Sequence, residues 1–353
     1  MEKICLNNKK FHVNNNTVVT VKEVIFIKFK NIFLKLFVII LLIIPLSVVA
    51  YSSKVIPGGE TIGIEVKSKG VLVVGFYEVD NKLIAKEAGF RPGDLIIKVN
   101  DTTISSIEDM LNVIEHRKSE MIKFTILRNS KEKDITLELK TTPDAVTKTG
   151  LYVKDKINGV GTLSYIDPNT KIFGSLGHEI LESKTSTKFE IKDGSIYEAN
   201  VSSITKSRVG TAGEKNASYN KEEVYGEINE NTISGIYGTY TDDITGKETI
   251  EIGKKETATT GEAIIRTVVE DNKVETFTIN ILKLNPDTTT KNILFEITDT
   301  KLLNKTGGII QGMSGSPIIQ NDKLIGAVNY VVVNDPKKGY GIFIETMLQE
   351  GEN

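Results

Sequence analysis

The segment IIQGMSGSPII, from Ile309 to Ile319, places a serine between two glycines inside two apolar runs, with Pro317 two residues beyond the second glycine. A polar turn in a β-protein would explain this pattern. A serine nucleophile with its oxyanion hole would explain it too, because Gly312 lets the chain turn until the N–H groups of Gly312 and Ser314 converge on one oxygen. The second interpretation requires a histidine and a carboxylate elsewhere.

The three histidines differ in position, and position selects one of them. His12 precedes the long apolar segment near the N-terminus, and His116 falls in a different predicted domain. His178, in FGSLGHEI, follows an apolar strand in the same β-rich region as Ser314. We therefore predict that His178 is the general base that accepts the proton of Ser314.

The residues alone leave the carboxylate open. The candidates in the β-rich region are Asp193, Asp242, Asp243, Asp271, Asp287 and Asp299. Asp299 ends an apolar strand, and strand ends commonly hold catalytic groups rigidly. It is one candidate among several at this point.

The region from 150 to 350 is predicted to be a β-barrel or sandwich, because short apolar strands alternate there with Gly, Asn and Asp turns. Asp271-Asn272-Lys273 closes an evident hairpin. The polar, Gly- and Asn-rich stretch 210–232 is predicted to be a loop.

Residues 58–141 have the order of elements of a second domain, after a predicted linker at 52–60. Two Val- and Ile-rich strands precede AGFRPGDLIIKVN (88–100). A helix from about Ile107 follows, with Ser106 and Asp109 as a capping box, and then a β-hairpin.

This order resembles the PDZ domains of exported proteases. The resemblance implies that Ile62-Gly63-Ile64 is the loop whose backbone amides hold a peptide carboxylate, while the adjacent strand edge accepts the peptide as an added strand. The alternative is that Gly63 only marks a bulge in a strand.

The N-terminus predicts a membrane span. Residues 32–51, IFLKLFVIILLIIPLSVVAY, carry one charge, Lys35, over the length that crosses a bilayer as a helix. Lysines at or before its start place the leader, 1–31, in the cytoplasm and the rest outside. A signal peptide cleaved before Tyr51 and a buried core helix are the alternatives.

Composition excludes several classes of function. With 353 residues, 39% of them hydrophobic, the chain can bury a core, and a net charge of −2 gives no support for nucleic-acid binding. Cys5 is the only cysteine, so the chain holds no internal disulfide and no cysteine-based metal site. We expect no metal and no cofactor.

Two long segments carry a family resemblance: GVGTLSYIDPNTKIFGSLGHEI (159–180) and the stretch from EITDTKLLNKTGG through GMSGSP to FIETML (296–348). They resemble the SpoIVB peptidase family. The resemblance implies a mainly β, membrane-associated serine endopeptidase of the chymotrypsin-like clan. It also implies that His178 is the base, Asp299 the orienting acid and Ser314 the nucleophile.

The resemblance further implies a role in sporulation signalling. Such a peptidase is exported from the forespore, cleaves a membrane-bound regulator of an intramembrane metalloprotease, and cuts itself near its N-terminal side. Two alternatives stay open: a quality-control PDZ protease, in which PDZ usually follows the peptidase domain, and a catalytically inactive protein that binds partners through PDZ.

Overall fold

The computed structural model describes residues 10–13, 17–20, 35, 51–139 and 147–352, and the chain divides into two units, 1–49 and 50–353. In the first unit, β1 (Lys10–Val13) and β2 (Thr17–Thr20) form an antiparallel hairpin. Nearly all of the predicted span at 32–51 lies outside the described residues. None of the described helices is both long and apolar enough to cross a bilayer.

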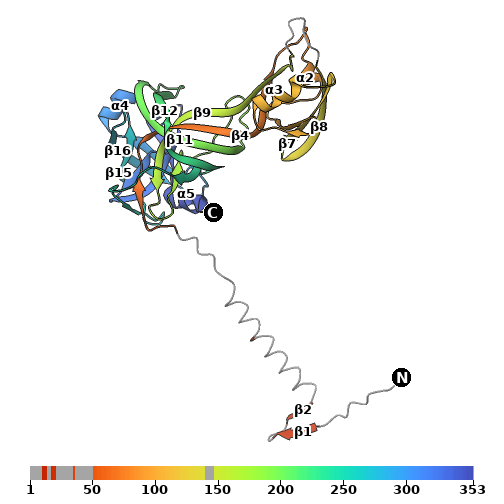
Figure 1. The fold of residues 1–353 in the computed structure, drawn as a ribbon. Helices are drawn as coiled ribbons and strands as arrows, with labels where there is room; N and C mark the ends of the chain where they lie inside the picture. Colours follow the sequence, from red (N-terminus) through yellow and green to blue (C-terminus); the bar gives the residue numbers. More distant parts are fainter. Residues whose placement is uncertain (1–9, 14–16, 21–34, 36–50, 140–146, 353) are drawn as a thin grey trace. The chain divides into compact units, whose positions relative to one another are not determined.

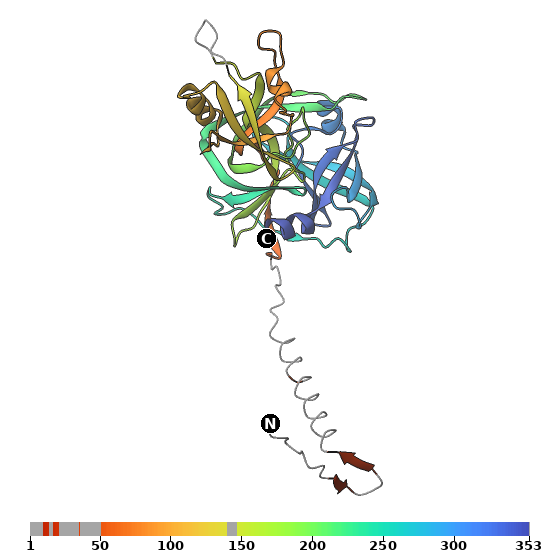
Figure 2. The same cartoon turned by 90° about the vertical axis from the view of Figure 1, so that its right-hand side faces the viewer.

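The second unit contains two closed antiparallel barrels (Figures 1 and 2). The strands of the first, in spatial order, are β4 (Thr61–Phe76), β9 (Leu151–Ile166), β10 (Ile172–Ser175), β13 (Gly235–Tyr240), β12 (Gly213–Thr232) and β11 (Ile191–Thr205), and β11 pairs with β4 to close the ring. Buried apolar side chains such as Ile62, Phe173 and Ile228 fill its interior.

The second barrel is built entirely from the C-terminal part of the chain. Its strands, in spatial order, are β15 (Gly261–Val268), β16 (Val274–Leu284), β17 (Ile293–Ile297), β21 (Lys338–Phe343), β20 (Lys323–Val331) and β19 (Pro317–Gln320), which returns to β15. Phe277, Phe295 and Ile318 lie in its core. The predicted β-barrel class is confirmed, as is the hairpin at Asp271-Asn272-Lys273.

Shorter elements complete the barrels. They are β3 (Lys54–Pro57), β14 (Ile250–Ile252), β18 (Ile310–Gln311), α4 (Thr300–Thr306) and α5 (Ile344–Gly351). Pairing of β3 with β9 and β14 shows that the segment at 52–60 is part of a barrel and not a linker.

The PDZ domain is inserted between β4 and β9, two neighbouring strands of the first barrel. Besides the ends of β4 and β9, its elements are α2 (Ile84–Glu87), β5 (Leu95–Val99), β6 (Thr102–Thr103), α3 (Ile107–Glu115), β7 (Met121–Arg128) and β8 (Lys131–Glu138). The capping box of Ser106 and Asp109 is present at the start of α3, as predicted. β7 and β8 form the predicted hairpin.

The predicted peptide-binding loop lies outside the PDZ domain. Ile62, Gly63 and Ile64 lie in the barrel half of β4, which pairs with β9 on one side and β11 on the other. A carboxylate-binding loop needs unpaired N–H groups, so this placement contradicts the prediction. Gly63 instead allows a close approach, because a Cβ there would lie 2.2 Å from the Tyr219 ring.

The stretch predicted as a loop at 210–232 is also different, because most of it forms β12, a strand of 20 residues. Its polar residues face solvent over much of the strand, while Ile228 and the other buried positions face the core. Pairing with β11 and β13 supplies the ordering that the composition does not suggest.

Candidate active site

The turn that carries Ser314 connects β18 to β19, at the junction of the two barrels. Gly312 and Gly315 have φ values of +90° and +95°, which side-chain-bearing residues rarely adopt. A Cβ on Gly315 would lie 2.0 Å from the carbonyl oxygen of Thr162, in the first barrel. Two glycines are therefore required, one for the bend and one for the close contact between barrels.

This turn leaves two backbone amides unused. Met313, Gly315 and Ser316 donate their N–H groups to other carbonyl groups. Among the contacts of the described residues, the N–H groups of Gly312 and Ser314 donate none. Buried amides are nearly always paired, so two free amides flanking a serine are what an oxyanion hole requires.

His178 lies in the same cavity as Ser314, which measures about 520 Å³. Its Nδ1 lies 2.8 Å from the carbonyl oxygen of Glu179, and its ring stacks on Tyr330. Since a carbonyl only accepts, Nδ1 carries the proton and Nε2 is left with a lone pair. Burial of the ring lowers the pKa of His178, which favours the neutral base at pH 7.

Among the described contacts, no hydrogen bond joins the hydroxyl of Ser314 to His178. The hydroxyl donates to the carbonyl oxygen of Asn329 at 3.2 Å. Asn329 is buried and is held by donation from Nδ2 to the carbonyl oxygens of Thr290 and Gly177. Hydrogen bonds between a nucleophile and its base commonly form or tighten only when substrate binds.

Asp299 does not lie at this site. Its carboxylate is the N-cap of α4 and accepts the N–H of Leu302 at 2.8 Å.

His178 and Ser314 line one cavity, Asp299 is not among the residues that line it, and the carboxylate of Asp299 caps α4. The role of Asp299 as the orienting acid stays a prediction. The group beside Nδ1 is the carbonyl of Glu179.

A buried lysine contacts the serine turn indirectly, through a threonine. Lys215 of β12 points its Nζ at three threonine hydroxyls, those of Thr61, Thr162 and Thr267, at 3.0–3.3 Å. Thr162 in turn donates its hydroxyl to the Gly312 carbonyl at 2.7 Å and its N–H to the Ser314 carbonyl at 2.9 Å. Burial lowers the pKa of Lys215 to about 7.

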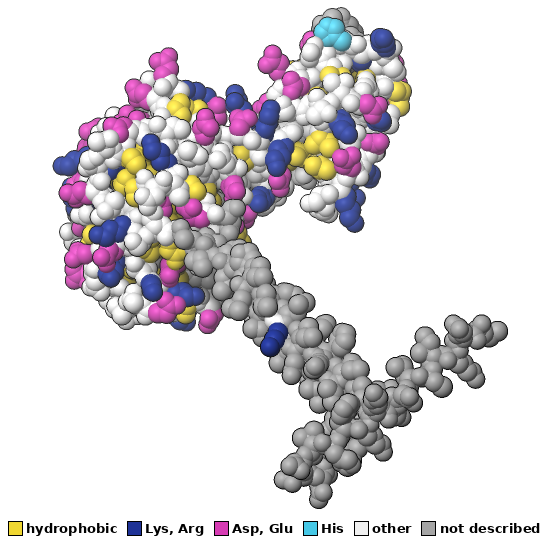
Figure 3. Space-filling view, turned by 60° about the horizontal axis from the view of Figure 1, so that its bottom comes forward, with side chains coloured by type: hydrophobic (Ala, Val, Ile, Leu, Met, Phe, Trp, Pro, Cys, Tyr) yellow, Lys and Arg dark blue, Asp and Glu magenta, His cyan; other side chains and the backbone are white. Residues whose placement is uncertain are grey.

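The walls of the cavity are mainly apolar. They come from four segments: Ile157, Gly159 and Val160 of β9, the loop 176–181, and the stretches 309–312 and 329–331 on either side of the serine turn. Apart from His178, its only ionisable lining side chains are Glu179 and Tyr330. On the face drawn in Figure 3, acidic and basic side chains are interspersed over the barrels and the PDZ domain.

The PDZ domain presents a strand edge beside a helix. Leu151–Lys154 of β9 pairs with β4 along one edge, and no strand of the described residues pairs with its other edge. Asp155 accepts the N–H of Ile107 at 2.8 Å, which fixes the start of α3 against this strand. An edge strand next to a helix is the arrangement by which PDZ domains add a peptide strand.

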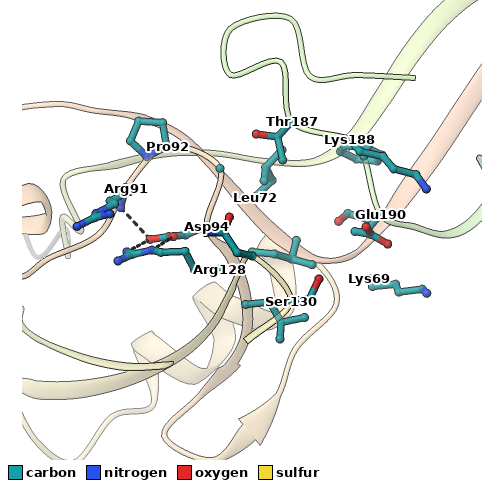
Figure 4. Close-up of a pocket in the computed structure, with 16 residues that line it drawn as sticks. Lys69, Leu72, Arg91, Pro92, Asp94, Arg128, Ser130, Thr187, Lys188 and Glu190 are labelled. Atoms are coloured by element: carbon teal, nitrogen blue, oxygen red, sulfur yellow. Dashed lines mark hydrogen bonds and ion pairs between the residues drawn. The ribbon is translucent and has the colours of Figure 1, made fainter. Parts of the chain in front are cut away.

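A second cavity, of about 560 Å³, lies between the PDZ domain and residues 187–190 (Figure 4). One wall is a buried ion pair in which both carboxylate oxygens of Asp94 lie 2.6 Å from the Arg128 guanidinium. Lys69 donates its N–H to the Glu190 carbonyl at 3.0 Å. The cavity therefore lies at the joint between the PDZ domain and the segment 187–190.

Sequence analysis missed several residues that build the site. Asn329, in the apolar run LIGAVNYVVV, had the clearest signal, because a polar side chain inside a buried strand needs a partner. Lys215 and Thr162 carried no comparable signal, since each sits in an ordinary alternating pattern. The backbone carbonyl of Glu179 could not be predicted, because every residue has such a group whatever its side chain.

Comparisons with known proteins agree with this architecture. A family model described as SpoIVB peptidase S55 matches residues 145–348, and a PDZ domain model matches residues 61–139. The curated protein "Probable protease eep" of Enterococcus faecalis is 26% identical over 102 residues, which are 26% of this chain and about a quarter (24%) of that protein.

Solved structures of one protease are also similar. The Rv3671c protease of M. tuberculosis in its active form has 14% sequence identity and a TM-score of 0.31, over 55% of this chain and 73% of that one. The inactive form has 11% identity and a TM-score of 0.31, over 54% and 82% of the two chains. Among the described residues, no cluster of three or more His, Cys, Asp or Glu could hold a metal ion.

Proposed function

Because the chain belongs to the SpoIVB peptidase family of serine proteases and carries a PDZ domain, we propose that it is an endopeptidase with Ser314 as nucleophile and His178 as general base. The observation that carries the proposal is the pair of unused amides at Gly312 and Ser314, which share a cavity with His178. A plain polar turn would pair those amides.

The reaction follows from the geometry. Nε2 of neutral His178 takes the hydroxyl proton as Ser314 attacks the substrate carbonyl, and the amides of Gly312 and Ser314 hold the resulting oxyanion. The imidazolium then returns the proton to the leaving amine. A second cycle, with water as the nucleophile, releases the acyl group. The Glu179 carbonyl keeps the imidazole in the required tautomer.

The cavity favours an apolar substrate residue. Ile310, Val331 and Leu176 line it, and none of its described lining residues is a lysine or an arginine. We therefore expect cleavage beside a medium-sized apolar side chain and poor cleavage beside Asp or Glu.

The PDZ domain recruits the protein substrate in this proposal. The edge of β9 at Leu151–Asp155, next to α3, replaces the sequence-predicted loop at Ile62-Gly63-Ile64 as the peptide site. Its support is the unpaired strand edge and the adjacent helix.

The cellular role is proposed from the family. We infer that the N-terminal segment, 32–51, anchors the protein in the forespore membrane or directs its export. The protein would cleave a membrane-bound regulator of an intramembrane metalloprotease and would cut itself to leave the anchor. The peptidase chemistry proposed above does not depend on this role.

Covalent labelling tests the proposal without a known substrate. A fluorophosphonate should label the purified protein at Ser314, and Ser314→Ala should abolish both labelling and self-cleavage while circular dichroism and melting stay unchanged. Absence of labelling in the folded wild-type protein would favour the inactive binding protein instead. Self-cleavage that persists in Ser314→Ala would exclude Ser314 as the nucleophile.

A further inference from the structure

One strand, β9, joins the peptide edge of the PDZ domain to the catalytic cavity. Its first residues, Leu151–Asp155, form the edge beside α3. Ile157, Gly159 and Val160 line the cavity that holds Ser314. Thr162 then contacts the serine turn through its N–H and its hydroxyl. The register with β4 is unbroken from Lys156 to Thr162, and it shifts between Lys156 and Lys154, where β4 bulges and β9 continues into the PDZ edge.

The outer edge of this strand is open between the two sites. N–H groups of a strand point alternately to its two edges. Thr162 directs its N–H away from β4, toward the Ser314 carbonyl, whereas Leu163 directs its own toward Glu60. Val160 and Asn158 therefore point outward like Thr162. In the part of the chain that the structure describes, no strand pairs with residues 151–162 on that side.

Resting on the function proposed above, we propose that one extended substrate polypeptide pairs with this edge of β9 continuously, from the catalytic cavity to the PDZ groove. An open edge adds an extended peptide through main-chain hydrogen bonds, with little dependence on its sequence. The apolar cavity then selects the residue that is cut. The PDZ groove selects the segment recognised further along the same polypeptide.

The geometry sets the direction and the spacing. Every pairing that β9 makes is antiparallel, and antiparallel ladders are the more stable kind. An antiparallel substrate runs from the cavity toward the PDZ domain, so the recognised segment lies C-terminal to the cut bond. Asp155 and Leu151 precede Val160 by five and nine residues (160 − 155 and 160 − 151). PDZ contacts therefore fall about five to nine residues after the cut bond.

A peptide library tests both features. The probe is a digest of a bacterial proteome, incubated with the full-length protein in detergent, and mass spectrometry identifies the cut peptides. We expect peptides with six or more residues after the cut bond to be cleaved at least about tenfold more efficiently than the same peptides shortened on the C-terminal side of that bond. Truncation on the N-terminal side beyond a few residues should have little effect.

A proline in β9 provides the matched variant. Asn158→Pro removes one outward N–H and preserves the pairing with β4, because proline is tolerated where the N–H faces solvent. It should abolish the advantage of long peptides, whereas Asn158→Ala, which retains the N–H, should keep it. Labelling of Ser314 by a fluorophosphonate, measured on both variants, reports whether the nucleophile is intact.

The outcomes separate the two proposals. If Ser314 of the wild-type protein is not labelled, the proposed function itself fails. If Ser314 is labelled but cleavage is independent of downstream length, depends on upstream length instead, is equal in Asn158→Pro and Asn158→Ala, or does not occur in the library, the continuous edge is wrong and the peptidase assignment stands.

Discussion

Two segments of the second barrel, the turn at Ser314 and the strand end at Asp299, look alike in sequence. They differ in which hydrogen-bonding groups lack a partner. The turn at Ser314 and the strand end at Asp299 are 15 residues apart (314 − 299), and both place a polar residue beside an apolar strand. Among the contacts that the structure describes, the N–H groups of Gly312 and Ser314 have no acceptor, and the Ser314 side chain lines a cavity. At Asp299, the carboxylate is already bonded to the first turn of α4.

The difference shows how a chemical role can be recognised. A group is available for catalysis when local hydrogen bonds do not already use it and when it faces a cavity. The two amides have no acceptor among the described contacts, and the Ser314 hydroxyl lies in the cavity with one weak bond, to the Asn329 carbonyl. Asp299 is bonded to α4 and lines neither of the two cavities described above. Four substitutions, taken in order of expected effect, test this contrast.

His178→Gln should have the largest effect. Loss of the base from a serine–histidine pair commonly lowers the rate by several orders of magnitude, so we expect fluorophosphonate labelling to slow by at least about a thousandfold. His116→Gln is the control, because His116 caps the exposed end of α3. Equal labelling rates for His178→Gln and wild type would show that another group activates Ser314.

The pH dependence of the wild-type protein sharpens the same test. Burial lowers the pKa of His178, and only the neutral ring accepts a proton. Labelling should therefore be full at pH 7 and should fall on acidification with a midpoint below the ordinary histidine value of about 6.5. A midpoint well above that value would contradict the buried, neutral base.

Gly315→Ala should have the next largest effect. The added Cβ would lie 2.0 Å from the Thr162 carbonyl, and φ at this position is +95°. The turn must then shift and misplace the Ser314 amide, and loss of one oxyanion donor costs about a hundredfold or more. Gly210→Ala is the control, because its φ is also positive (+84°) but nothing lies within 4 Å of the added Cβ.

How much of this contrast the sequence can reveal depends on the range of the interactions. The nucleophile turn, the capping box of α3 and the hairpins are local patterns, so spacing predicts them. The split of β4 between two domains is not local. TIGIEV is an apolar strand in either setting, and only pairing with β11, more than a hundred residues later, assigns it to the barrel.

The groups of the candidate site can also be divided into those that the sequence predicts and those that it does not. Ser314 and His178 can be chosen by residue type and position. The groups that orient them are two backbone carbonyls, those of Glu179 and Asn329, together with the buried Lys215, which acts through Thr162. Backbone groups are present at every position, so no sequence pattern distinguishes the ones that fold next to the nucleophile.

Lys215→Met should have a moderate effect on activity. It removes the Nζ group that donates to the Thr162 hydroxyl, while the Thr162 bonds to the serine turn can persist. We expect labelling to slow about tenfold, the scale of one hydrogen bond. An unchanged rate would show that Thr162 is held without the lysine. Lys221→Met, at a lysine on the exposed side of the same strand, is the control.

The same variant should alter the pH dependence of stability. The pKa of Lys215 is lowered to about 7 from 10.5. Between these values the unfolded chain binds a proton that the folded protein does not. The wild-type free energy of unfolding should therefore rise with pH across this window, relative to Lys215→Met. Urea unfolding of both proteins at pH 7 and pH 9 measures the difference, and parallel pH profiles would show that Lys215 stays charged when folded.

Asp299→Asn should have the smallest effect, and it decides the comparison. Asparagine caps helices about as well as aspartate, so α4 should be preserved and labelling of Ser314 should change by less than about threefold. Asp299→Ala should lower the free energy of unfolding by about 1 kcal/mol through loss of the cap, with labelling of the folded fraction again nearly unchanged. If Asp299 instead orients His178, as the family resemblance implies, Asp299→Asn should slow the reaction by about 10⁴-fold without affecting stability. A loss of that size would mean that α4 rearranges when substrate binds and that the N-cap seen here is a resting position of the acid.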